Sequence, residues 1–135
     1  MMIQIYYKIT DHFKWDDFEC SCCGEIFLTR RFFKHIDLLE QIRIEIGWPI
    51  GVNSGHRCKK HNIAVGGEDK SQHLIFATDL TPIFTEHDTD DIWLQKKTQL
   101  YERGLEVFDG VGLYDWGVHL DLRGFKAKWD NRKVV

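Results

Sequence analysis

Residues 118–123 alternate between apolar and polar side chains, and this alternation constrains the fold more than any other feature of the chain. A period of two residues is typical of a β-strand that buries one of its faces. The polar members His119, Asp121 and Arg123 would then share the other face and point into one pocket or groove. An ordinary edge strand with a solvated polar face would show the same alternation, so this strand alone does not identify a site.

A second segment, further upstream, combines a histidine with a carboxylate in apolar surroundings. His73 is followed by the largely apolar run 74–80, in which Asp79 stands, and Pro82 follows the run. We expect a buried strand over this run. A carboxylate in such a strand costs free energy unless it is paired or bound to a metal ion. The alternative is that Asp79 caps a turn just before Pro82.

Taken together, the two segments supply a possible set of metal ligands. His73, Asp79 and His119 are two imidazoles and a carboxylate, a set that holds zinc with one coordination position left open. A zinc ion lowers the pKa of water bound at that position to roughly 7, which makes the water a nucleophile at neutral pH. The sequence therefore predicts a metal-dependent hydrolase with Zn²⁺ as its cofactor.

The size and charge of the chain narrow the class of protein further. With 135 residues, 43% of them hydrophobic, the chain can bury one core, so we expect a single domain over residues 1–135. The net charge of −3, without a basic run, gives no sign of nucleic-acid binding. Apolar stretches are too short to span a membrane. Residues 1–10 lack the pattern of a secretory signal, so we expect synthesis in the cytosol, and a monomer.

Helical and strand patterns alternate along the chain, which favours an α+β fold with a small, mainly antiparallel sheet flanked by helices. The first long helix is expected after Thr29 and should end at Gly47; a later one should begin near Thr89 and end at Gly104. The remaining expected elements are a strand at 49–53, a short helix at 59–64, the strand at 74–80, and an antiparallel pair at 107–114 and 118–123.

Several short motifs follow one another in a fixed order. They are Ser54-Gly55-His56-Arg57-Cys58, His61-Asn62, Val65-Gly66-Gly67, Ser71-Gln72-His73 with Ala77 and Asp79, Gly110-Val111-Gly112-Leu113-Tyr114, Val118-His119-Leu120-Asp121, and Arg123-Gly124 through Lys128-Trp129. In this order they resemble the M15 family of zinc D-Ala-D-Ala carboxypeptidases and murein endopeptidases. The likeness extends over residues 13–129 and is greatest to the short domains of bacteria and of phage endolysins. It implies a hedgehog/D-Ala-D-Ala-peptidase fold.

The resemblance also implies roles for individual residues. It implies zinc bound by His73, Asp79 and His119, with Arg57 holding the scissile carbonyl or the developing oxyanion. Ser71 would help to bind the peptide or carboxylate end of the substrate. Considered alone, Arg57 could be a surface residue in the first turn of a helix, and Ser71 could cap the turn before His73. The implied substrates are the stem peptides of peptidoglycan, cleaved either at a terminal D-Ala or at an internal bond.

The chain is one residue shorter than the family pattern between two of these ligands. Family members usually have seven steps from the histidine to the aspartate, whereas His73 and Asp79 are six apart and no glycine lies between His73 and Ala77. A residue missing from the loop before the strand would leave the ligands convergent. A residue missing within the strand would turn Asp79 to the other face.

The residue at the position of the general base also differs from that of several relatives. Those relatives have an acidic residue three positions before the last ligand, where this chain has Trp116. Asp115 and Asp121 are the candidates to replace it. Asp121 is favoured because it lies two residues after His119, on the same strand face. Asp121 could instead orient a ligand histidine from behind.

The four cysteines, Cys20, Cys22, Cys23 and Cys58, need a separate explanation. They could bind a structural zinc, but their spacing lacks the paired C-x₂-C knuckles typical of such sites. Related M15 domains often have cysteines at these two places, which implies a disulfide from Cys58 to one of the other three.

Three functional hypotheses follow. The leading one is a murein-directed zinc peptidase acting on the cell wall, for instance as a phage lysin. The second is a catalytically inactive zinc- or murein-binding module of the same fold, which the short His73–Asp79 spacing and Trp116 motivate. The third is a domain organised by cysteine-bound zinc with an unrelated function.

Overall fold

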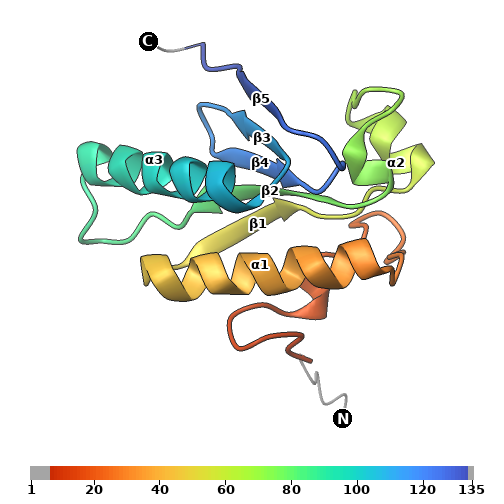
Figure 1. The fold of residues 1–135 in the computed structure, drawn as a ribbon, viewed down its shortest axis with the longest axis horizontal. Coiled ribbons are helices and arrows are strands. Elements are labelled where there is room, and N and C mark those ends of the chain that lie inside the picture. Colours follow the sequence, from red (N-terminus) through yellow and green to blue (C-terminus); the bar gives the residue numbers. More distant parts are fainter. Residues whose placement is uncertain (1–6, 134–135) are drawn as a thin grey trace.

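A five-stranded sheet forms the centre of the computed structural model, which describes residues 7–133 (Figure 1). The strands are β1 (Ile50–Ser54), β2 (Ala77–Pro82), β3 (Gly110–Leu113), β4 (Val118–Asp121) and β5 (Ala127–Asp130). Their order across the sheet is β1-β2-β4-β3-β5. All neighbouring pairs are antiparallel except β3 and β5, which run parallel. The expected α+β architecture with a mainly antiparallel sheet is therefore confirmed.

Three α-helices accompany the sheet in the described residues. They are α1 (Arg30–Ile46), α2 (Lys59–Ala64) and α3 (Asp90–Val107). Two short 3₁₀ helices are also present: η1 (Trp15–Asp17) comes before α1, and η2 (Gln72–Leu74) comes before β2. Helix α1 begins as predicted, because the Thr29 hydroxyl accepts a hydrogen bond from the Phe32 backbone N–H at 3.1 Å. It ends at Gly47, whose φ of 74° is the left-handed conformation that glycine adopts without strain.

The two faces of the sheet have different roles. Helices α1 and α3 flank it (Figure 1), and the core lies between them and the face formed by Leu80, Val118 and Leu120. Because side chains alternate along a strand, Asp79 and His119 point to the opposite face. The hydrophobic core thus fixes the strands from one side and leaves the other side available for a polar site.

Several expected boundaries differ from the structure. The strand expected at 118–123 ends at Asp121. The strand expected at 74–80 begins only at Ala77, because η2 occupies the residues before it. Gly104 does not end α3; it lies within the helix, where a Cβ atom would stand 2.5 Å from a methyl group of Leu120, so it permits close packing on the sheet. The helix runs on to Val107, which shortens the following strand to Gly110–Leu113.

Strand β5 was not among the expected elements, and the expected disulfide is absent. All four cysteines are free, and the sulfur atoms of Cys22 and Cys58 lie 4.0 Å apart, far beyond a bond of about 2.05 Å. Cys58 nevertheless does lie beside the N-terminal cysteines. The expectation about residues 1–10 falls largely outside the described chain.

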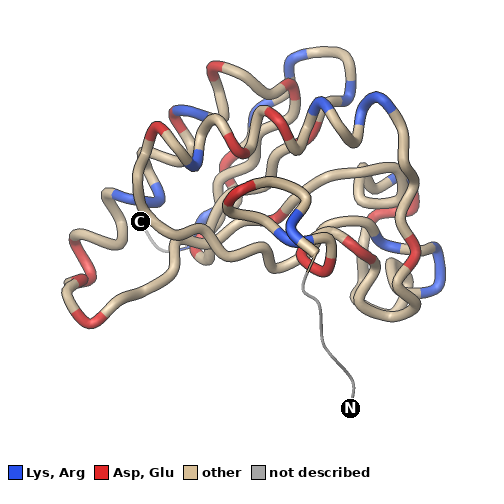
Figure 2. Tube along the Cα trace, turned by 90° about the horizontal axis from the view of Figure 1, so that it is seen from below, with Lys and Arg blue, Asp and Glu red and all other residues tan. Residues whose placement is uncertain are grey.

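Basic and acidic residues are interspersed along the trace (Figure 2). Within residues 7–133, none of the helices has the length and apolar character needed to cross a bilayer.

His35 is a polar residue at the centre of the core. Its side chain has no exposed surface, and its Nε2 atom lies 2.9 Å from the hydroxyl of Thr78 on β2. Burial lowers the pKa of His35 to about 3, since the charged imidazolium would lose its hydration. The neutral imidazole is therefore the form that the folded state contains.

We expect the His35→Gln variant to lose less stability than the wild type when the pH is lowered. A histidine with a lowered folded-state pKa stabilises the fold above its unfolded pKa of 6.5, and this contribution is lost as the pH falls from there toward about 3. The wild-type free energy of unfolding should therefore fall more steeply than that of the variant, by at most about 1.4 kcal/mol per pH unit. Urea denaturation at a series of pH values measures this, with the exposed His87→Gln as control. Equal slopes would contradict the interpretation.

Candidate functional site

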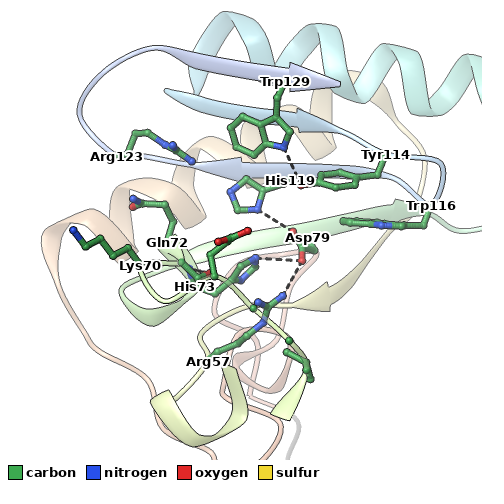
Figure 3. Close-up of a pocket in the computed structure, with 15 residues that line it drawn as sticks. Arg57, Lys70, Gln72, His73, Asp79, Tyr114, Trp116, His119, Arg123 and Trp129 are labelled. Carbon is green, nitrogen blue, oxygen red and sulfur yellow. Dashed lines mark hydrogen bonds and ion pairs between the residues drawn. The ribbon is translucent and has the colours of Figure 1, made fainter. Parts of the chain in front are cut away.

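Pairing of β2 with β4 brings two of the predicted ligands together. Asp79 and His119 are direct partners in the antiparallel register, and both side chains lie on the face away from the core. His73 arrives from a different element, the 3₁₀ helix η2 just before β2. All three side chains line one pocket of about 430 Å³ (Figure 3). The structure thus brings together the three residues expected to bind metal.

The ligand atoms of these three residues all lie within 4.8 Å of one another. One carboxylate oxygen of Asp79, Oδ2, is 3.2 Å from Nε2 of His73, and the other, Oδ1, is 3.0 Å from Nδ1 of His119. Both nitrogens therefore face the same carboxylate from two directions. Such a cluster offers two nitrogen ligands and one oxygen ligand to a single cation.

The outer nitrogen of each imidazole is held by another group. Nδ1 of His73 lies 2.7 Å from the Gly55 carbonyl oxygen, and Nε2 of His119 lies 2.7 Å from Oδ2 of Asp121. A carbonyl and a carboxylate only accept hydrogen bonds, so these outer nitrogens carry the protons. The inner nitrogens of the neutral rings then present lone pairs toward Asp79.

Those lone pairs fit a metal ion. Nε2 of His73 is buried and has no hydrogen-bond partner, although it lies close to an anionic oxygen. A cation between the rings and the carboxylate would replace this unfavourable contact with coordination bonds. Without metal, a proton can take this place: burial lowers the pKa of His119, but its bonds to Asp121 and Asp79 outweigh that effect and raise it. Metal binding should therefore weaken on acidification.

Asp121 lies behind His119 rather than in the pocket. Its side chain has no exposed surface and is not among the residues that line the pocket. Besides His119 it accepts hydrogen bonds from Arg123, at 2.9 Å from Nε and 2.7 Å from Nη2. Burial raises the pKa of Asp121, but these contacts outweigh that effect and hold it well below its usual range. The geometry matches the orienting role that was the alternative to a general base.

Asp115, the other candidate for the base, belongs to a different surface. It is exposed in the turn between β3 and β4, and its carboxylate accepts a hydrogen bond from the backbone N–H of Lys133 at 3.0 Å. It does not line the pocket that contains the three candidate ligands.

Arg57 reaches the pocket from the loop between β1 and α2. Its Nη2 lies 3.3 Å from Oδ2 of Asp79, and its remaining donors contact Ser54 and Asn62, each at 3.2 Å. Three partners from different segments thus fix the guanidinium beside the candidate metal ligands. Ser71 also lines the pocket, and its hydroxyl accepts a hydrogen bond from the His73 backbone N–H, so it does cap η2.

The pocket has an aromatic wall that the sequence patterns did not reveal. Trp129 on β5 donates a hydrogen bond to the Tyr114 hydroxyl at 2.8 Å, and its ring lies 5.2 Å from the ring of His119. Gly112 stands between Trp129 and His119 in the register, and a Cβ atom there would lie 2.4 Å from the indole. The glycine therefore lets the indole fold over β3. Trp116 stacks on Tyr114 and extends the wall.

A carboxylate that was not predicted also lines the pocket. Glu68 lies in the loop after Gly66 and Gly67, and its backbone carbonyl is held by the Asn62 side chain at 2.8 Å. The run Gly66-Gly67 signalled a turn, but nothing in the sequence indicated which side chain after it would face the pocket.

A model of one known protein family matches most of the chain. The family model described as Peptidase M15 matches residues 11–121, which include all three candidate metal ligands, Arg57 and Glu68. A search of curated proteins finds no match to the chain.

Replacing Asp121 by asparagine should weaken metal binding without abolishing it. The amide lacks the charge that orients the His119 N–H and pairs with Arg123, so we expect the dissociation constant of the metal ion to rise by about 10- to 100-fold. Competition with a chelator measures this constant, and only the metal ion that is lost in the His119→Ala variant is counted. Asp130→Asn is the matched control, because Asp130 makes the same bonds to Arg132 two residues on but is exposed. Unchanged affinity in Asp121→Asn would contradict the orienting role.

Proposed function

The chain belongs to the peptidase M15 family, and from this we propose that it is a zinc peptidase that cleaves D-amino-acid-containing bonds in peptidoglycan stem peptides. Membership supports a metallopeptidase in general. The observation that carries the finer proposal is the convergence of His73, Asp79 and His119 at one side of an open pocket. We treat residues 1–135 as one domain that acts as a monomer.

Zinc suits the site because two imidazoles and one carboxylate leave a coordination position free. Bound there, it would polarise the peptide carbonyl and supply a nucleophilic water at neutral pH. Asp79 faces both rings and so brings the charge that a dication needs. His73 and His119 keep fixed ring orientations because Gly55 and Asp121 hold their outer nitrogens.

Arg57 is our candidate for binding the substrate carbonyl as its oxygen gains negative charge. The guanidinium lines the pocket and is held by Ser54, Asn62 and Asp79. A cation that is already in position needs no rearrangement when charge develops, which makes its stabilisation of the transition state large.

Glu68 is our candidate for the general base. Among the pocket-lining residues of the described chain, it is the carboxylate that remains once Asp79 is assigned to the metal. Asp121 is saturated by His119 and Arg123, and Asp115 lies outside the pocket. A glutamate at this position would take a proton from the attacking water and pass it to the departing amine.

The substrate class rests on the family and on the lining of the pocket. Lys70, Arg57 and Arg123 supply positive charge, and the aromatic wall supplies flat apolar surface. Stem peptides carry carboxylates and short aliphatic side chains, which suit such a lining. Removal of a terminal D-Ala and cleavage of an internal bond are both compatible with the open pocket. Action on the cell wall, for instance as a phage lysin, is part of the proposal.

One observation favours a second candidate, an inactive zinc- or murein-binding module. Trp116 occupies the position at which several relatives have an acidic residue, and it is 39% exposed beside the pocket. If Glu68 does not replace that acid, the protein would bind zinc and murein but would not cleave murein.

Substitution of His119 tests the proposed function. We expect wild-type protein to release new amino termini or free D-Ala from purified murein, and His119→Ala to lose this activity together with about one zinc per chain. Elemental analysis and product analysis measure the two effects. His87→Ala, on the exposed surface, is the control. Zinc retained by wild type with no hydrolysis at any pH would favour the inactive module.

Substitution of Glu68 tests the assignment of the base. Glu68→Gln keeps the size of the side chain but cannot accept the proton, so we expect kcat to fall by about 10²- to 10⁴-fold with the zinc content unchanged. The matched control is Asp69→Asn, a neighbouring exposed acid that does not line the pocket. An active Glu68→Gln enzyme would rule out this residue as the base.

A further inference from the structure

A second cluster of metal-ligating side chains lies outside the pocket. Cys20, Cys22 and Cys23 come from the loop between η1 and α1, and Cys58 immediately precedes α2. None of the four lines the pocket of the candidate active site. The mechanism proposed for the peptidase does not use them.

Three of the four thiols are in mutual contact, and the fourth, that of Cys23, lies next to two of them. The sulfur atoms of Cys20, Cys22 and Cys58 all lie within 4.8 Å of one another, and those of Cys22 and Cys58 are 4.0 Å apart. The Cys23 thiol interacts with those of Cys20 and Cys58. Two chain segments that are 35 residues or more apart in sequence therefore bring their cysteine side chains together.

The backbone around Cys20 favours a thiolate at that residue. Sγ of Cys20 accepts hydrogen bonds from the backbone N–H groups of Cys58, at 3.3 Å, and of Cys22 and Cys23. Burial raises the pKa of the Cys20 thiol, but these donors outweigh that effect and lower it to about 7. Sγ of Cys58 accepts a hydrogen bond from the His61 N–H at 3.3 Å. Backbone N–H groups directed at the Cys20 sulfur stabilise its deprotonated form, which is the form that binds metal. The contact with Cys58 raises the pKa of Cys22 instead. At Cys23 a hydrogen bond with the Glu25 backbone lowers the pKa, but burial and the contacts with Cys20 and Cys58 outweigh it and raise the pKa to about 11.

The loop that carries three of the cysteines is a tight turn. The backbone N–H groups of Cys23 and Gly24 both donate to the Cys20 carbonyl oxygen, at 3.3 and 2.7 Å, and Gly24 has a φ of 73°. This turn folds Cys22 and Cys23 back toward Cys20, so neighbouring residues can ligate one ion although they lack a C-x₂-C pair.

We propose that Cys20, Cys22, Cys23 and Cys58 together bind a structural zinc ion. In a tetrahedral zinc–thiolate site, Zn–S bonds of about 2.3 Å place the sulfur atoms about 3.8 Å apart. The 4.0 Å between Cys22 and Cys58 is close to this spacing and twice the length of a disulfide bond. A single disulfide would join only two of the four thiols and would leave the other two beside it, whereas one zinc ion can bind all four. Four thiolates favour zinc over magnesium or calcium.

This second zinc would fasten the N-terminal segment to the loop that carries Arg57. The same two segments already meet elsewhere: the His56 N–H donates to the Phe18 carbonyl oxygen at 2.9 Å, and a Cβ atom on Gly55 would lie 2.5 Å from that oxygen. Cys58 directly follows Arg57, and the Gly55 carbonyl orients His73. Zinc bound by the cysteines would thus hold both residues in place without touching the substrate.

Metal counting with variants tests the second site. We expect two zinc ions per chain in wild type, one in Cys22→Ser, one in His119→Ala and none in the double variant. Ser21→Ala, at the neighbouring residue, is the matched control and should retain two. Because each variant removes a ligand of one site only, failure of the cysteine site is distinguishable from failure of the peptidase proposal.

Cobalt substitution of the unaltered wild-type protein gives a second measurement that does not depend on how a variant folds. Tetrahedral Co²⁺ bound by four thiolates shows intense thiolate-to-metal charge-transfer absorption, which we expect in wild type and in His119→Ala but not in Cys22→Ser. A single zinc per wild-type chain that Cys22→Ser leaves unchanged would overturn the proposal. So would a disulfide, detected by mass after alkylation of the protein purified without reductant.

Discussion

The antiparallel register between β2 and β4 is the constraint on which the candidate site depends. It sets Asp79 directly opposite His119, with both side chains on the face away from the core. The same register buries Leu80 and Leu120 on the other face. A slip of one residue would turn Asp79 into the hydrophobic core and Leu80 into the pocket. Hydrophobic burial on one face therefore enforces metal-ligand geometry on the other.

Despite the short spacing between them, His73 and Asp79 converge in the structure. His73 belongs to η2, which ends two residues short of the start of β2 at Ala77, and its ring is oriented by the Gly55 carbonyl rather than by the sheet. A residue missing from that connection changes how the chain enters the strand but does not change the face on which Asp79 lies. This is the alternative in which the ligands still converge.

The sequence patterns predicted those features of the structure that depend on residues close together in the chain. The cap at Thr29 and the apolar periodicity after it gave α1 its observed bounds, and strand alternation placed His119 and Asp121 on one face. Alternation specifies a face but not the neighbours on it, so the contact of Asp121 with the back of His119 stayed one of two alternatives. Strand β5 was missed because Ala127–Asp130 has little strand character of its own and is a strand through its pairing with β3. Glu68 was missed because its direction depends on a loop.

The candidate site combines parts of unequal rigidity. Asp79 and His119 are fixed by the sheet, whereas Arg57 and the Gly55 carbonyl belong to a loop that the sheet holds at one end only. That loop packs closely against the backbone of Phe18, so the position of the loop depends on an N-terminal segment with little regular structure. A small protein can order such a segment with a metal ion or a covalent link more readily than with further core. The four thiols lie where that link is needed, at the far end of the loop from the sheet.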